Sequence, residues 1–240
     1  LYVHNMDGTV KQFFPSGALN NVDLRGEVKI NGVDAVLVAA SDRADATHSK
    51  LALYALSPQT AKLTELANLP AGSGEAYGLC LYRRPADKAL FAFVVEKSGR
   101  IIQLRVDVSG EQPAAFVVRE MQLASQAEGC VADDRTGRLY VGEEDVGIWR
   151  FDANPDGATR GEPFAKVDKR MLVDDVEGLA LAQIGERGGY LVASSQGDSS
   201  YAVYALEDGK PIGRFQIDDN GKGVDGTSET DGIELMLGDF

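Results

Sequence analysis

Short apolar runs separated by polar turns follow one another along this chain. Between residues 128 and 149 the apolar run CVA is followed by the turn residues DDRTG, a second apolar run, RLYVG, the acidic residues EED, and then GIWRF. Asp and Gly favour tight turns, and apolar runs of this length between such turns indicate β-strands. Three carboxylates therefore lie where one predicted strand ends, a loop position that often carries functional side chains. A solvated turn is the alternative interpretation of this triplet.

This unit recurs at a nearly constant spacing. Each copy opens with a residue followed by glycine, and the openings are Arg25-Gly26, Tyr77-Gly78, Glu128-Gly129, Glu177-Gly178 and Asp231-Gly232. The intervals of 52, 51, 49 and 54 residues are close to the period of about 50 residues expected for a four-stranded propeller blade. No helical periodicity interrupts the repeats, so the sequence predicts an all-β fold.

Four complete repeats are flanked by two partial ones. The first residues, LYVHNMDGTVKQFF, have the pattern of a hairpin and are interpreted as the outer two strands of a blade. The segment VDGTSETDGIELML opens a further repeat near the other end. The predicted blades cover approximately residues 1–23 (partial), 24–72, 73–124, 125–172, 173–224 and 225–240 (partial).

Composition and charge limit the classes of function. The chain is 44% hydrophobic, enough for a substantial core, and it lacks an apolar run of the roughly 18 residues that span a bilayer. The formal net charge of -13 argues against nucleic-acid binding, because a phosphate backbone requires a basic surface. An acidic protein that acts on an anion would need metal cations as intermediaries. Cys80 and Cys130 follow their repeat openings by three and two residues, and strand alternation then predicts opposite faces and buried free thiols.

The second predicted strand of each complete repeat ends in a polar corner. These corners are Ser41-Asp42-Arg43, Glu96-Lys97-Ser98, Glu143-Glu144-Asp145 and Ser195-Gln196-Gly197. In a ring of blades, equivalent positions converge on one rim of the central channel. The residues expected at this rim are Arg43, Lys97, Glu144 and Gln196 from the corners, Tyr77, Glu128, Glu177 and Asp231 from the openings, and Asp175.

The expected rim combines carboxylates with cationic side chains. Carboxylates that cluster without partners raise one another's pKa, so such clusters are normally neutralised by bound cations. Hard oxygen ligands in a site built from loops favour Ca²⁺, with Mg²⁺ and Mn²⁺ as alternatives. Arginine and lysine are suited to phosphate oxygens. A polar, water-filled channel or a structural Ca²⁺ plug would also explain the acidic residues.

Seven stretches of the chain match one known family in order and spacing. They are LNNVDLR (19–25), AASDR (39–43), AYGLCLY (76–82), EGCVADDRTGRLYVGEEDVGIWRFDANPDG (128–157), DDVEGL (174–179), YLVASSQGDSSYAVY (190–204) and FQIDDNGKGVDGTSETDGIE (215–234). Through these stretches the sequence closely resembles the bacterial β-propeller phytases, which are alkaline and calcium-dependent. The resemblance implies a six-bladed β-propeller of four-stranded antiparallel blades. It also implies calcium-dependent hydrolysis of phytate, myo-inositol hexakisphosphate, to lower inositol phosphates and phosphate by metal-activated water, an activity of the 3-phytase type.

The resemblance also assigns roles to residues of this chain. The phosphate-binding positions would be Arg43, Tyr77, Lys97 and Gln196. The Ca²⁺-binding acids of the active site would be Glu128, Glu144, Asp175, Glu177 and Asp231. Asp225 and the loop containing Asn20 and Val22 match positions that bind structural Ca²⁺. Glu128, Glu144, Glu177, Lys97 and Arg43 would take part in catalysis, and Ser98 stands where the family usually has a second glutamate.

The resemblance further implies a context for the reaction. The partner would be phytate or calcium phytate, with neither nucleic acid nor membrane involved, and the location would be secreted or periplasmic. Because a six-bladed ring at about 50 residues per blade needs roughly 300 residues, the 240 residues are expected to form an incomplete ring. The chain is interpreted as a fragment, or as a naturally incomplete domain of a longer protein, in which a second phytase domain could be a partner.

Two other functions stay open at this point. The chain could be an incomplete, non-catalytic, calcium-binding propeller that binds phytate or assists a complete phytase domain. It could also be a propeller hydrolase of the lactonase type, for which the arginine and lysine of the rim would have no use.

Overall fold

The computed structural model describes residues 1–223 and 225–238. In these residues the regular structure is almost entirely β, with one 3₁₀ turn at Gln196–Asp198. None of the described residues forms a helix with the length and apolar character needed to cross a membrane. The chain divides into two compact units, residues 1–97 with 101–120 and residues 98–100 with 121–240.

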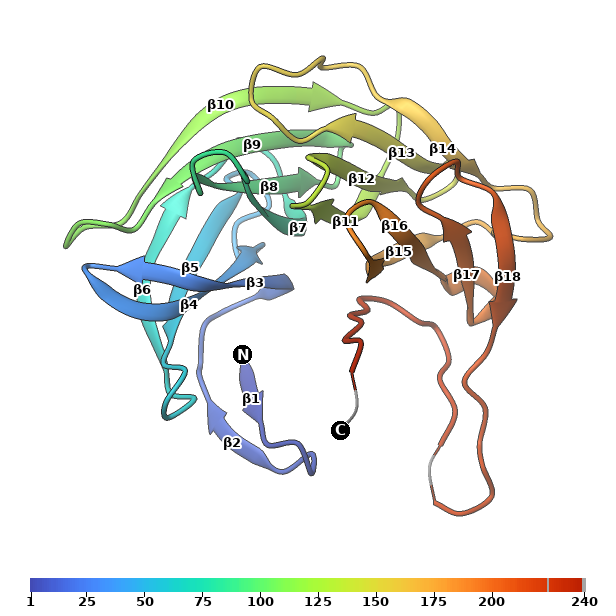
Figure 1. Cartoon of the computed structure of the whole chain (residues 1–240), viewed down its shortest axis with the longest axis horizontal. Coiled ribbons are helices and arrows are strands. Elements are labelled where there is room, and N and C mark those ends of the chain that lie inside the picture. The colour runs from blue at the N-terminus through green and yellow to red at the C-terminus, as the bar shows by residue number, and fades with distance from the viewer. Residues whose placement is uncertain (224, 239–240) are drawn as a thin grey trace. The chain divides into compact units, whose positions relative to one another are not determined.

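The first unit is built around two four-stranded antiparallel sheets, which Figure 1 shows in blue to green. One sheet contains β3 (Leu19–Ile30), β4 (Val33–Asp42), β5 (Lys50–Leu56) and β6 (Leu63–Pro70) in sequence order. The other contains β7 (Ala76–Arg83), β8 (Leu90–Glu96), β9 (Arg100–Asp107) and β10 (Ala114–Gln122), also in sequence order. Leucines such as Leu37, Leu53, Leu81 and Leu104 are fully buried in one core shared by both sheets.

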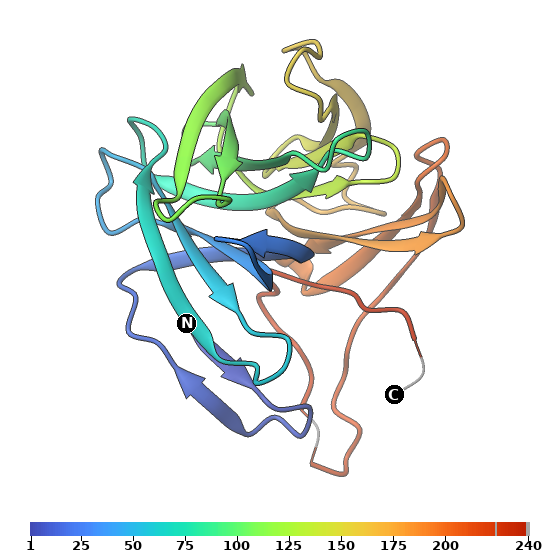
Figure 2. The same ribbon diagram turned by 60° about the vertical axis from the view of Figure 1, so that its left-hand side comes forward.

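A separate hairpin precedes these sheets. Strands β1 (Tyr2–His4) and β2 (Val10–Phe13) pair only with each other among the described strands, as the sequence predicted and as Figure 2 shows. Leu1, Val3 and Phe14 pack against the first sheet, where the ring of Phe14 meets that of Tyr54 edge to face. The hairpin is therefore anchored to the first sheet by apolar packing.

The second unit repeats the same arrangement. One sheet contains β11 (Ala127–Asp133), β12 (Arg138–Glu143), β13 (Gly147–Asp152) and β14 (Glu162–Lys166). The other contains β15 (Val176–Ile184), β16 (Gly188–Ser195), β17 (Ser200–Ala205) and β18 (Pro211–Phe215). The core of this unit includes Tyr140, Ile148, Leu179 and Leu191. The predicted all-β fold is confirmed, and four blades of four antiparallel strands are present.

Strand pairing defines which residues are equivalent in the four blades. The first strand of each blade begins opposite the end of the second, in the pairs Leu19 with Asp42, Ala76 with Glu96, Ala127 with Glu143 and Val176 with Ser195. A β-bulge follows each of these pairs. The next residues are therefore equivalent, and they are Asn20, Tyr77, Glu128 and Glu177.

This register corrects the predicted opening of the first repeat. Asn20-Asn21, rather than Arg25-Gly26, corresponds to Tyr77-Gly78. Gly26 lies inside β3 at a second bulge, between Arg25 and Val28, where its sequence pattern mimics an opening. The segment containing Asn20 and Val22 is likewise part of a strand and not a loop, and β3 crosses the predicted boundary after residue 23.

The cysteines and the last described segment differ from the sequence-based expectation. Both cysteines, Cys80 and Cys130, are disulfide-bonded, so the prediction of free thiols is wrong. Strand alternation describes the faces of one strand, but it does not determine which distant segment approaches that face. The segment 225–238, interpreted as the opening of another repeat, has no strand among its described residues.

Candidate functional site

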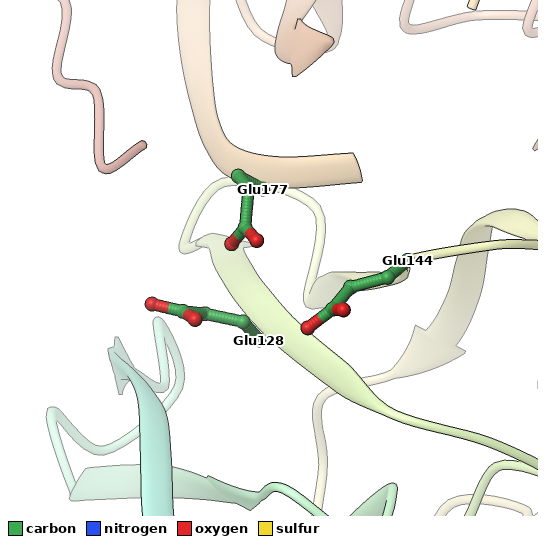
Figure 3. Close-up of side chains that lie close together, drawn as sticks. All are labelled: Glu128, Glu144 and Glu177. Carbon is green, nitrogen blue, oxygen red and sulfur yellow. The ribbon is translucent and has the colours of Figure 1, made fainter. Parts of the chain in front are cut away.

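Three glutamates of the second unit gather into one buried cluster. Glu128 is the second residue of β11, Glu177 is the second residue of β15, and Glu144 directly follows β12. One carboxylate oxygen from each lies within 4.8 Å of the others, and Figure 3 shows the three side chains. The exposed fractions of these residues are only 2%, 4% and 7% for Glu128, Glu177 and Glu144, respectively. Three of the predicted metal ligands are thus brought together away from solvent.

Glycines allow the strands that carry this cluster to approach closely. A Cβ atom on Gly129 would lie 1.9 Å from the carbonyl oxygen of Glu177, and one on Gly178 would lie 2.5 Å from that of Asp231. Any side chain at either position would push the backbones apart. Gly129 and Gly178 therefore have a packing role, because each lies directly against the backbone of the following opening.

Hydrogen bonds fix the backbone of Glu144. Its N–H donates to the carbonyl of Gln126 at 3.0 Å, and its own carbonyl accepts from the N–H groups of Asp175 at 3.0 Å and Val176 at 3.1 Å. The side-chain amide of Gln126 also donates to both carboxylate oxygens of Glu144 at 2.8 Å. Asp175 has a φ of 71°, a left-handed conformation that carries a small energetic cost in a non-glycine residue.

The electrostatics of the cluster are unfavourable in the absence of a cation. Burial, followed by repulsion from Glu128, Glu144, Asp231 and Asp175, raises the pKa of Glu177 to about 9. Burial also raises the pKa of Glu144, with further contributions from Asp175 and Glu128, although the hydrogen bond from Gln126 opposes the shift. The buried Oε2 atom of Glu177 has no hydrogen-bond partner. The Glu177 carboxyl is therefore buried among like charges, with one oxygen that has no hydrogen-bond partner.

The donor set fits a hard divalent cation. Buried carboxylates are costly unless they are paired, protonated or bound to a metal. A cation held by Glu128, Glu144 and Glu177 would satisfy the unpartnered oxygen of Glu177 and remove the repulsion that raises its pKa. Oxygen ligands alone suit Ca²⁺ or Mg²⁺ better than the metals that prefer nitrogen or sulfur.

The first unit gathers three of the predicted phosphate-binding residues. The guanidinium carbon of Arg43 lies 4.8 Å from the ring centroid of Tyr77, and the Nζ atom of Lys97 lies 5.3 Å from it. Arg43 also forms an ion pair with Glu75 and donates to Oδ1 of Asn20 at 3.2 Å. Two cationic groups therefore lie over one aromatic ring, each at a distance typical of a cation–π interaction.

Backbone contacts hold Tyr77 in this position. Its carbonyl oxygen accepts hydrogen bonds from the Ser41 hydroxyl at 2.8 Å and from the side-chain amide of Asn20 at 3.1 Å. Asn20, predicted to belong to a structural calcium site, thus contacts both Arg43 and Tyr77 through its side chain. Its equivalence to Tyr77 in the strand register was not recognised from the sequence because that register depends on the bulge.

The remaining predicted residues lie outside the glutamate cluster. Gln196 begins the 3₁₀ turn and donates its N–H to the carbonyl of Asp175 at 3.0 Å. Asp231 is exposed, and its carbonyl accepts from the N–H of Gly178 at 3.2 Å. Asp225 is exposed and accepts from the N–H of Gly226, while Val22 is an exposed residue of β3. The functional roles of these residues stay predictions.

The acidic corner EED separates into three different environments. Glu143 is 1% exposed and bonds to Ser125 and Trp149, Glu144 joins the cluster, and Asp145 is exposed. The sequence pattern did not predict a role for Glu143 or Gln126. Strand alternation could have indicated that Glu143 and Glu144 have different roles. Neighbouring residues at the end of a strand are expected to point in different directions.

Comparison with known proteins agrees with this geometry. A family model described as Phytase matches residues 1–239 of the chain. The chain belongs to the phytase family. This membership confirms the resemblance found in the sequence.

One curated relative in this family has a named activity. A 3-phytase of Bacillus subtilis (strain 168) is 36% identical to the chain over 242 residues, which cover 98% of the chain. The match covers 63% of that relative, so the chain spans less than two thirds of its length.

Proposed function

We propose that this phytase-family chain hydrolyses phytate to lower inositol phosphates and phosphate in a calcium-dependent reaction of the 3-phytase type. The observation that carries the proposal is the buried cluster of Glu128, Glu144 and Glu177, whose unpartnered oxygen and repulsion call for a cation. Family membership and the named 3-phytase support phytate as the substrate. Arg43 and Lys97, which lie beside Tyr77, supply cationic groups of the kind that bind phosphate.

The proposal assigns separate tasks to the two groups of residues. Glu128, Glu144 and Glu177 would hold Ca²⁺, which when bound supplies positive charge that polarises phosphate oxygens and activates water. Arg43 would donate in a fork to two phosphate oxygens, and Lys97 would add a point charge.

The other predicted site residues would have supporting roles. Gln196 would add an amide donor to the phosphate contacts. Asp175 and Asp231 would increase the negative potential that attracts the cation, consistent with their effect on the pKa of Glu177. Tyr77 and Glu75 would keep the cationic groups oriented, since both contact Arg43.

The proposal also covers the context of the activity. We infer a six-bladed ring, to which this chain contributes four full blades and parts of two others. Asp225, and the segment that contains Asn20 and Val22, would each contribute to binding structural Ca²⁺. The partners would be phytate or calcium phytate and a second phytase domain, without nucleic acid or membrane, in a secreted or periplasmic location.

Phosphate release from calcium phytate tests the central proposal. The chain is expected to release inorganic phosphate in excess Ca²⁺ and to lose this activity in excess chelator, because the carboxylate cluster would then lack its cation. The alternative is a non-catalytic, calcium-binding propeller. The observation that favours it is that the match covers only 63% of the 3-phytase relative. Calcium-dependent binding of phytate without phosphate release would support that alternative, and release unaffected by chelator would contradict the metal requirement.

The two cationic residues give a more specific prediction. Arg43→Ala and Lys97→Ala are each expected to raise KM roughly tenfold to a hundredfold, because a hydrogen bond to a charged group contributes about 1.5–3 kcal/mol. The turnover number should change less, since phosphate is present in the ground state as well as in the transition state. Steady-state kinetics would measure both constants. Lys62→Ala, which removes the same charge from an exposed position in the first unit, should leave KM unchanged, and an equal effect in all three variants would contradict specific phosphate contacts.

A further inference from the structure

All four blades share one backbone contact at their polar corners. The residue that follows the second strand donates its N–H to a carbonyl near the start of the first strand of the same blade. The four bonds, each 3.0 Å long, are Arg43 to Ala18, Lys97 to Glu75, Glu144 to Gln126 and Gln196 to Asp175. The segment that leads into each blade therefore determines where the corner residue lies.

In the third blade a buried carboxylate locks this leading segment. Glu143, the last residue of β12, accepts hydrogen bonds at Oε1 from both the N–H and the hydroxyl of Ser125, each at 2.7 Å. Its Oε2 accepts from the indole N–H of Trp149 on β13 at 2.7 Å. Glu143 thus ties the segment before β11 to β13, and its carboxylate uses three donors in a buried position.

The locked segment leads directly to the metal centre. Ser125 precedes Gln126, which accepts from the backbone of Glu144 and donates to both oxygens of its carboxylate. Glu143 itself does not belong to the cluster of three glutamates. Its influence on the cluster would therefore be indirect, through Ser125 and Gln126.

We propose that Glu143 is a positioning residue for the metal centre, which acts through Ser125 and Gln126 to fix the direction of the Glu144 carboxylate. This inference rests on the proposed function in one respect, namely that Glu144 is a cation ligand. Residues that orient metal ligands typically change metal affinity by about 10- to 100-fold when they are replaced.

Calcium binding to the 240-residue chain, measured by calorimetry, tests this role. Glu143→Gln should weaken Ca²⁺ binding at least about tenfold, because Ser125 and Trp149 donate to different carboxylate oxygens and the amide has an NH₂ donor in place of one of them. The matched control is Glu96→Gln. Glu96 occupies the equivalent position in the second blade, is equally buried, and accepts from the Ser49 hydroxyl at 2.9 Å and the Gly74 N–H at 2.8 Å. If Glu143 had a purely structural role, the two variants would have the same Ca²⁺ affinity. That result would overturn the proposal.

A double variant separates positioning from the loss of one negative charge. In Glu143→Gln/Trp149→Phe the charge is still absent, but the conflict between the glutamine amide and the indole N–H is removed. The remaining amide oxygen can accept from Ser125 again. Positioning predicts that Ca²⁺ affinity returns to that of Trp149→Phe alone, whereas affinity as weak as that of Glu143→Gln would mean that only charge matters.

Hydrogen exchange provides a readout that needs no metal. In chelator, the N–H groups of Glu144, Asp175 and Val176 should exchange faster in Glu143→Gln than in the parent, and Glu96→Gln should leave them unchanged. If the parent binds no Ca²⁺, the proposed metal site fails, and these exchange rates still decide the positioning role. Unchanged rates in Glu143→Gln would overturn it.

A milder replacement covers the case in which Glu143→Gln does not fold. Ser125→Ala removes the hydroxyl donor to Glu143 and keeps the backbone donor. It should weaken Ca²⁺ binding by roughly two- to tenfold, the effect expected for one hydrogen bond. An unchanged affinity in this variant would count against the proposal.

Discussion

Glu177→Gln is expected to stabilise the metal-free chain at neutral pH and, at the same time, to remove most of its Ca²⁺ binding and turnover. The glutamine keeps the shape of the side chain and needs no proton, whereas Glu177, with a pKa of about 9 in the folded chain, must take up a proton on folding at neutral pH. Loss of a cation that stabilises charge in the transition state should lower turnover on the order of 100-fold. Urea unfolding in chelator and kinetics in excess Ca²⁺ would measure the two effects.

The pH dependence of this stabilisation has a definite sign. The pKa of Glu177 is about 9 in the folded, metal-free chain against an ordinary value of 4.5, so the folded state holds a proton that the unfolded state releases. The contribution of Glu177 to stability is therefore fully present below pH 4.5 and is lost as the pH rises toward 9. Between pH 5 and pH 7 the parent should lose roughly 2–3 kcal/mol through this group.

Glu177→Gln should remove this slope, and excess Ca²⁺ should reduce it in the parent. Asp145→Asn is the control, because it removes a charge from an exposed neighbour of Glu144 and should leave the slope close to that of the parent. If stability had the same pH dependence in Glu177→Gln and in the parent, the pKa of Glu177 would not be raised as described.

Gly129→Ala is expected to have the largest effect of a single added methyl group. The new Cβ atom would lie 1.9 Å from the carbonyl oxygen of Glu177 and 3.2 Å from the Cα atom of Gly178, and both are backbone atoms. Because backbone cannot move aside as a flexible side chain can, the free energy of unfolding should fall by about 1–3 kcal/mol or more. The displacement of β15 from β11 should also weaken Ca²⁺ binding.

Gly213→Ala provides the control for this substitution. Gly213 lies in β18 of the same unit, and a Cβ atom there would meet no other atom within 4 Å. Urea unfolding and Ca²⁺ titration should show little change in this variant. A Gly129→Ala chain as stable as Gly213→Ala, with unchanged Ca²⁺ affinity, would contradict the close approach of the two strands.

Much of the fold could be predicted because it is encoded locally. The runs RLYVG and GIWRF became β12 and β13, and the hairpin at the start of the chain was also predicted. The predicted polar corners are confirmed as well, since β4, β8, β12 and β16 all end within them. Strand alternation and turn residues are properties of a few neighbouring positions, so the sequence displays them directly.

Register and long-range pairing were less accessible. Arg25-Gly26 imitated an opening because a second bulge in β3 also uses glycine, and the true equivalent, Asn20-Asn21, has no glycine. The state of Cys80 and Cys130 was predicted incorrectly for a related reason. In both cases the outcome depends on which distant segments pair, and neighbouring positions in the sequence do not determine this.

The acidic corner EED shows how the determinants of this protein divide. The sequence by itself determined that three carboxylates follow a strand, that the unit repeats about every 50 residues, and that the chain resembles the phytases. Only the tertiary structure decided that Glu144 joins Glu128 and Glu177, whereas Glu143 turns to Ser125 and Trp149. The physical reason is that a buried carboxylate is defined by its hydrogen-bond donors and charged neighbours, and here these come from segments far apart in the chain.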